Sequence, residues 1–341
     1  MISCNKPLCL FFVLCSMFVA IGAEAVEPAA TIRLQEPWSN VFAGKETVFH
    51  ATLATIEPFD GRLAWRFSVD GRTLSRGESA VKAGPTATGT VEVRINVPAV
   101  KPGVIMQTTL SVSASQTGSD KEVATLDRTL WVFPEDPFTG RTEWLKKLNI
   151  RLFDPVGTTA KLFTDGGVPF AEIRNVDALT SIEAGTLIVG EGVSLKEYRG
   201  LAENLIKAAA AGRPVLCLAL DNGEMQLPVS VNPALPQPTS LVFHQQDIIT
   251  QLDKRLDAGG WKRNGKASAS GLKLRGDRGP VMAEVSRDAG MWPWMELGFE
   301  KENGKLVVCG FGIVGAWAES PTPRFLLLKV LEHVSGNKEK E

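Results

Sequence analysis

The stretch TLIVGEGVSLKEYRGLAENLIKAAAAGRPVLCLALDNG, residues 186–223, decides the fold class of the C-terminal part of the chain. It contains two apolar runs without polar alternation, Leu187-Ile188-Val189 and Val215 to Leu220. Between them, Ser194 is a candidate N-cap, and apolar residues recur at helical spacing from Leu195 to Ala211. Fully apolar strands joined by a helix are typical of a parallel sheet that is covered on both faces.

The sequence around this stretch extends the same alternation of strands and helices. Further strands are expected at Leu148 to Phe153, near Val281 to Val285, and at Leu306 to Phe311. Short helical patterns cover Thr158 to Phe163 and about Pro323 to Val334. We therefore predict an α/β domain over residues 140–336 with a mainly parallel, flavodoxin-like sheet.

The N-terminal part follows a period of two instead. Leu63, Trp65, Phe67 and Val69 alternate with polar residues, and Asp70-Gly71 is a turn signal. About seven such runs, separated by Gly, Pro and Asp, predict an antiparallel β-sandwich over residues 26–136. Trp65 shares a face with three apolar residues, so we expect core packing, with sugar stacking as the alternative.

The boundary between the two regions is expected at Pro134, Asp136 and Pro137, because proline restricts both itself and the residue before it. The whole chain is thus predicted to be an α+β protein of two domains.

Residues 1–25 resemble a cleaved signal peptide. Lys6 precedes an apolar run from Leu8 to Ile21, and Ala23-Glu24-Ala25 is a small-x-small cleavage site, so the mature chain is expected to begin at Val26. The alternative is an uncleaved anchor, but a spanning helix needs about 20 apolar residues. We expect a periplasmic or secreted bacterial protein with no membrane span after cleavage.

Charge and cysteine content narrow the classes of partner. The net charge is −1, and lysine and arginine are dispersed, which argues against nucleic acid as a partner. Cys217 and Cys309 remain after cleavage, and both sit in apolar runs that predict buried thiols; a disulfide between them is the alternative. The three histidines are scattered and no metal-ligand spacing occurs, so we predict no metal and no cofactor.

Three acidic residues follow predicted strands of the α/β region: Asp154, Glu191 and Asp221. The carboxyl ends of parallel strands meet at one edge of a sheet, where such folds bind ligands. These carboxylates are our candidate catalytic residues, forming an acidic rim for a metal ion, a polyol or acid–base hydrolysis. In the alternative interpretation, each one satisfies a following turn or helix N-terminus.

A second candidate site lies near the C-terminus. Trp292, Trp294 and Glu296 could bind a sugar, with the indole rings stacking on C–H faces and the carboxylate orienting hydroxyls. The alternative is that the tryptophans pack the last strands against the closing helix, since one member of an i, i+2 pair in a strand faces inward.

Both regions resemble parts of known proteins. Gly61-Arg62-Leu63-Ala64-Trp65, Val97-Pro98 and Leu130-Trp131-Val132-Phe133-Pro134 resemble the immunoglobulin-like sandwiches attached to bacterial β-galactosidase-type glycoside hydrolases. The α/β pattern, with its tryptophan-rich and Pro-x-Arg C-terminal segments, resembles the class I glutamine amidotransferase-like fold in a non-catalytic form. The catalytic cysteine of that family falls at Asp221 within Ala219 to Gly223, and the family's His-Pro-Glu has no counterpart.

The resemblance implies an exported, non-catalytic binding or scaffolding protein linked to carbohydrate metabolism, whose partner is a carbohydrate or another exported protein. The alternatives are a hydrolase that uses the acidic rim and a structural envelope protein.

Overall fold

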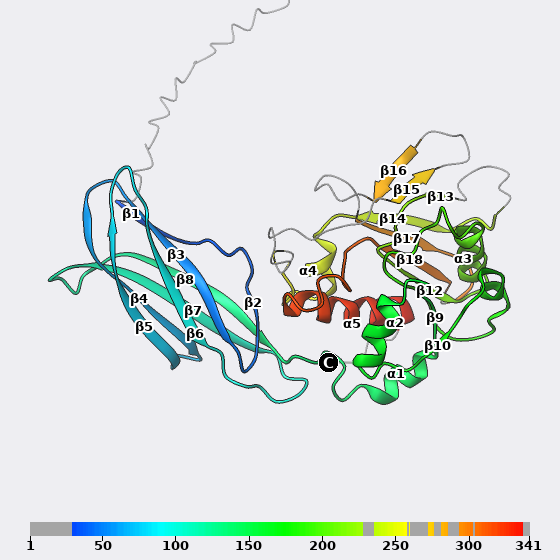
Figure 1. The fold of residues 1–341 in the computed structure, drawn as a ribbon, viewed down its shortest axis with the longest axis horizontal. Helices are drawn as coiled ribbons and strands as arrows, with labels where there is room; N and C mark the ends of the chain where they lie inside the picture. The colour runs from blue at the N-terminus through cyan, green and yellow to red at the C-terminus, as the bar shows by residue number, and fades with distance from the viewer. Residues whose placement is uncertain are drawn as a thin grey trace, which may run out of the picture.

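The computed structural model describes residues 29–227, 235–257, 259, 272–275, 281–285, 293–302 and 304–336. The predicted signal peptide and Trp292 lie outside the described residues. Figure 1 shows an N-terminal β region followed by a region in which helices cover a large sheet. No helix in the described ranges is long and apolar enough to cross a bilayer.

The N-terminal region consists of two sheets that share one core. Its strands are β1 (Ala30–Leu34), β2 (Asn40–Phe42), β3 (Glu46–Thr55), β4 (Phe59–Val69), β5 (Arg72–Ala83), β6 (Gly89–Asn96), β7 (Met106–Gln116) and β8 (Glu122–Phe133). The sheets have the orders β1-β3-β6 and β2-β8-β7-β4-β5, and every pair is antiparallel except β2 with β8. Phe49 and Leu53 of one sheet and Leu63, Phe67 and Leu110 of the other are completely buried in the shared core. The predicted period-two strands of this region are confirmed.

Trp65 is partly buried and packs against the core of the N-terminal region. Its indole Nε1 donates to the Arg94 carbonyl, at 3.1 Å, on a strand of the opposite sheet. Its ring lies so close to Gly77 that a Cβ at that position would fall 2.4 Å from it. Trp65 therefore packs against the margin of the core, and part of its side chain remains exposed.

The C-terminal region is built on a seven-stranded sheet of order β10-β9-β11-β12-β18-β17-β14. The strands are β9 (Ile150–Phe153), β10 (Phe170–Glu172), β11 (Leu187–Val189), β12 (Pro214–Leu218), β14 (Ser240–His244), β17 (Trp294–Gly298) and β18 (Lys305–Cys309). The first five in spatial order are parallel, and β17 is antiparallel to both of its neighbours. The prediction of a mainly parallel sheet is thus confirmed.

One predicted strand lies elsewhere. Residues 281–285 form β16, which pairs with β15 (Leu272–Arg275) in a small separate sheet that also contains β13 (Glu224–Gln226). The apolar pattern predicted the strand, but it carried no information on which sheet the strand would join.

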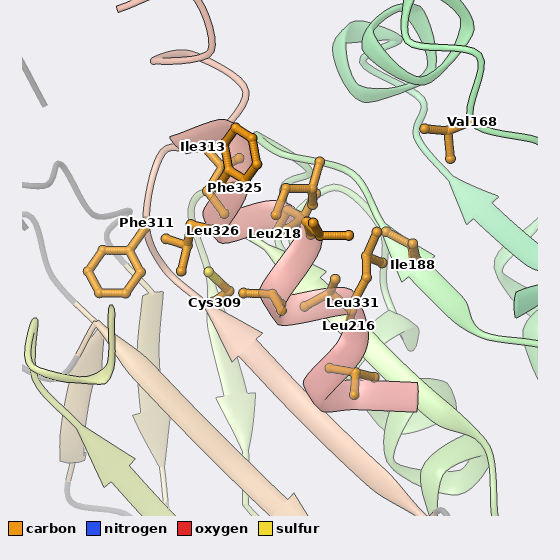
Figure 2. Close-up of a cluster of buried hydrophobic side chains, with 14 of the residues drawn as sticks. Val168, Ile188, Leu216, Leu218, Cys309, Phe311, Ile313, Phe325, Leu326 and Leu331 are labelled. Atoms are coloured by element: carbon orange, nitrogen blue, oxygen red, sulfur yellow. The ribbon is translucent and has the colours of Figure 1, made fainter. Parts of the chain in front are cut away.

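Helices cover both faces of the large sheet. They are α1 (Thr142–Leu148), α2 (Thr158–Asp165), α3 (Leu201–Ala210), α4 (Ile248–Leu252) and α5 (Pro321–Ser335), together with a 3₁₀ helix η1 (Val176–Ser181). Alternate residues of each strand face opposite layers: Leu216 and Leu218 join a cluster with α5, whereas Cys217 joins a cluster with α3. Figure 2 shows Leu216, Leu218 and Cys309 pointing toward Leu326 and Leu331 of α5. This two-sided burial explains why the strands are apolar at every position.

Two predicted boundaries were wrong. The helix expected from Leu195 begins at Leu201, because the backbone N–H groups of Leu195 and Lys196 donate to the carbonyls of Asp221 and Asn222 instead. The strand expected from Leu148 begins at Ile150. Leu148 ends α1, and Asn149 adopts the left-handed conformation, with φ 47°, that often ends a helix.

Buried contacts connect the two regions. Phe133 packs on Phe325, with ring centroids 4.7 Å apart. The Asn40 side chain, which is 2% exposed, donates to the Arg255 carbonyl at 2.6 Å and accepts from the Thr322 hydroxyl at 3.2 Å. Because both polar ends of a buried amide are satisfied across the junction, these contacts favour one arrangement of the two regions.

Candidate functional site

Asp154, Glu191 and Asp221 occupy the same edge of the large sheet. They follow β9, β11 and β12, which are adjacent and parallel. The topology therefore brings them to the carboxyl edge, as the sequence predicts. Each of the three side chains, however, makes hydrogen bonds to a different kind of partner.

Asp154 caps α2. Its Oδ2 accepts a hydrogen bond of 2.7 Å from the Ala160 N–H in the first turn of that helix, where a carboxylate is stabilised by the helix dipole. Its Oδ1 is buried and has no hydrogen-bond partner among the described residues. A Cβ at position 190 would fall 2.4 Å from this oxygen, so Gly190 permits the close approach.

Glu191 holds the loop that follows β18. Its Oε2 accepts from the Val314 N–H at 2.7 Å, and its Oε1 accepts from the Gly315 N–H at 3.0 Å. The backbone N–H of Glu191 donates to Thr159 Oγ1 at 2.9 Å. Thr159 directly precedes Ala160, whose N–H donates to Asp154. Burial raises the pKa of the Glu191 carboxyl above its ordinary value, although the backbone N–H groups of the loop oppose this shift.

Asp221 belongs to a local turn. Its Oδ2 accepts from the Asn222 side-chain amide at 2.9 Å, and its backbone pairs with Val193 and Leu195. The residue directly after β12 is Ala219, which has φ 25° and is 6% exposed. After this turn the chain forms a bridge at Asp221 and continues into β13, so the turn lacks the following helix of a nucleophile elbow.

The three carboxylates thus bind backbone and amide groups of their own chain. In the ranges that the structure describes, no three His, Cys, Asp or Glu side chains are grouped so that they could hold a metal ion. The geometry therefore matches the alternative interpretation of Asp154 as a helix cap, and of Glu191 and Asp221 as residues that order loops.

At the second candidate site, Trp294 is a core residue. Its side chain is completely buried in the layer that contains α5, and its ring lies edge-on to His333, with centroids 5.8 Å apart. A fully buried indole has no face left for a sugar, so the platform predicted from Trp292, Trp294 and Glu296 loses this member. Trp292 lies outside the described residues.

Glu296 is held by His333 and Lys305. Its Oε2 lies 2.6 Å from His333 Nε2, and its Oε1 lies 2.9 Å from Lys305 Nζ. Burial would raise the pKa of this carboxyl, but the hydrogen bonds and charges of His333 and Lys305 outweigh it and lower the pKa to about 2. Glu296 is therefore a charged structural link between β17, β18 and α5.

The cysteines are free and buried. Cys309 pairs with Leu218 across two strands, so Cys217, one residue earlier, faces the opposite layer. Burial raises the pKa of both thiols, that of Cys309 to about 12. Neither group is a reactive nucleophile at neutral pH.

Sequence reasoning missed the partners of these groups. The segment Phe311-Gly312-Ile313-Val314-Gly315, which supplies the N–H groups for Glu191, has the spaced glycines of a loop that exposes its backbone, and this signal was available. The pairing of Glu296 with His333 joins residues 37 positions apart and had no local signal.

No protein-family model matches the chain, and no curated protein matches it in sequence. Among solved structures, the chain is similar to a cycloisomaltooligosaccharide glucanotransferase from Paenibacillus sp. complexed with cycloisomaltoheptaose, with 11% identity and a TM-score of 0.26 over 55% of this chain and 28% of that one. It is also similar to a sporulation control protein from Bacillus subtilis, with 13% identity and a TM-score of 0.23 over 35% of this chain and 54% of that one. The chain spans less than two thirds of either structure, and at these TM-scores neither likeness carries an argument.

Proposed function

We propose that this chain is an exported, non-catalytic binding or scaffolding protein linked to carbohydrate metabolism. In this proposal, the N-terminal region is an immunoglobulin-like sandwich and the C-terminal region is a degenerate amidotransferase-like domain. Its partner is a carbohydrate or another exported protein in the periplasm or outside the cell.

The non-catalytic role in this proposal is supported by the hydrogen bonds that the carboxylates make at the carboxyl edge of the large sheet. Catalytic carboxylates need lone pairs that face a substrate, and acid–base pairs need environments that separate their pKa values. Glu191 directs both of its oxygens to backbone N–H groups of residues 314–315, and Asp221 directs one oxygen to Asn222. At the position of the amidotransferase cysteine, Asp221 carries a carboxylate in place of a thiol.

The test of this proposal is a glycan array probed with the mature chain beginning at Val26, run beside a broad hydrolase screen. We expect binding to at least one glycan class and no turnover of any substrate. Turnover in the screen would contradict the non-catalytic role, and an array without any binding would contradict a carbohydrate partner.

A hydrolase is the second candidate, and one observation favours it. The raised pKa of Glu191 suits a general acid, while Asp154 Oδ1, without a partner, suits a base, and both residues contact the start of α2. If this candidate is right, Glu191→Gln and Asp154→Asn abolish an activity that Asp221→Asn leaves intact. Equal activity in all three variants would remove it.

A further inference from the structure

A pocket lies between the segment that joins the two regions and the carboxyl edge of the large sheet. Its volume is about 540 Å³. Its walls come from residues 135–138, from α2, from the loop that Glu191 holds, and from Arg324 at the start of α5. Volumes of roughly 300–1,000 Å³ are typical of small-molecule sites, which occur preferentially at junctions between domains and at the carboxyl ends of strands.

One wall of this pocket is aromatic and rigid. Trp317 is partly exposed, and its ring is nearly parallel to that of Phe138, at 18° with centroids 6.4 Å apart. The Arg324 guanidinium lies 5.6 Å from the Trp317 ring centroid and donates through Nε to the Trp317 carbonyl at 2.7 Å. An indole fixed in this way loses little conformational freedom when a ligand binds.

Arg324 also ties the pocket to the N-terminal region. Its Nη1 donates to the Glu135 carbonyl at 2.8 Å, and its guanidinium lies 4.6 Å from the Phe42 ring centroid. The N-terminal region therefore helps to fix the position of Arg324 in the wall of the pocket.

The charges around the pocket are mixed. Lys161 pairs with Asp165 along α2 at 2.7 Å, and Glu135 pairs with Lys45 outside the lining. Asp136 uses both of its oxygens locally, accepting from the Phe138 N–H and the Thr139 hydroxyl. Donors and acceptors of both signs beside an aromatic face suit an uncharged polyhydroxyl ligand better than an anion or a cation.

We infer that this pocket binds a neutral sugar, with one pyranose ring on Trp317 and its hydroxyls at the Lys161–Asp165 pair. The inference rests on the proposed function and adds a site that the sequence analysis did not identify. It also places the ligand contacts on Trp317, away from the buried Trp294.

The experiment is saturation-transfer NMR and calorimetry on the mature chain with maltose, cellobiose, lactose and xylobiose, followed by the glycan that binds best on the array. The variants are Trp317→Ala, Trp317→Phe, and Lys161→Ala with Asp165→Ala. Lys161 and Asp165 are largely exposed, so the double variant will fold. The matched control is Trp38→Ala, because Trp38 is a partly exposed tryptophan, as Trp317 is, but does not line the pocket.

We expect Trp317→Ala to weaken binding by about tenfold or more and the double variant by about threefold or more, with Trp317→Phe in between and Trp38→Ala unchanged. Binding that survives in both Trp317→Ala and the double variant would overturn the pocket and leave the proposed function standing. If none of the sugars binds to the parent chain, on the array or in solution, both the pocket and the carbohydrate partner of the proposed function fail.

Discussion

His333 Nε2 lies 2.6 Å from Glu296 Oε2 and so joins the last helix to a strand that is 37 positions earlier in the chain. Lys305 Nζ holds the second oxygen at 2.9 Å. The cluster packs beside Trp294, whose ring meets the imidazole edge-on. Burial would raise the pKa of Glu296, but the hydrogen bonds and charges of His333 and Lys305 outweigh it and lower the pKa to about 2.

This pairing makes the stability of the fold sensitive to acid. The folded-state pKa of Glu296 lies below its ordinary value of 4.5, so its contribution is complete above that pH and is lost as the pH falls from 4.5 to about 2. At pH 7, Glu296→Gln should reduce the free energy of unfolding by about 1–3 kcal/mol, because it removes the charge from two hydrogen bonds. Urea unfolding from pH 7 to pH 2.5 measures both effects.

The control for this prediction is Glu143→Gln, which removes an exposed carboxylate paired with Lys146. A charge in open solvent contributes little, so this variant should unfold at the parent's midpoint. A Glu296→Gln variant that is as stable as the parent across the whole pH range would contradict the structural role of the cluster.

Trp294→Ala should reduce stability and leave glycan binding unchanged. Removing a completely buried tryptophan leaves a cavity, which costs about 3–5 kcal/mol. Calorimetric melting together with the glycan array separates the two effects. Lost affinity at an unchanged melting temperature would restore the sugar platform that the sequence predicts at this position.

Cys217 and Cys309 should resist thiol reagents in the folded protein. Their thiols are buried with raised pKa values, so we expect slow labelling at pH 8 and complete labelling in guanidinium. Val242→Cys supplies a positive control, because Val242 is 41% exposed. Cys217→Ala should cost about 1 kcal/mol and leave binding intact. Rapid modification of the native chain would show that one of these thiols is accessible.

The fold and the site differ in how far the sequence predicts them. Each central strand is buried on both faces and is therefore apolar throughout, as in Val215 to Leu220. This pattern predicts the parallel sheet, and with it the positions of Asp154, Glu191 and Asp221 along the edge of the sheet. The start of α3 could not be, because residues 195–196 pair with residues 221–222, a tertiary contact that overrides a helical pattern. The pocket beside Trp317 combines four separate segments, and no local spacing reveals it.

Export is a prediction of the sequence and has a simple test. Expressed in a bacterium with its native N-terminus, the protein should accumulate outside the cytoplasm and begin near Val26, because Ala23-Glu24-Ala25 offers small residues to the signal peptidase. N-terminal sequencing of the exported fraction identifies the first residue. Recovery of exported protein that still begins at Met1 would refute cleavage.

The most direct measurement follows the fate of a bound glycan. The mature chain is incubated overnight with the glycan that it binds best, and the recovered glycan is analysed by mass spectrometry beside an enzyme-free sample. A binding protein whose carboxylates are committed to its own backbone should return the glycan intact and bound in a fixed ratio to the chain. Cleavage or transfer products that appear with the parent chain and disappear with Glu191→Gln would instead identify an enzyme that works at the carboxyl edge of the sheet.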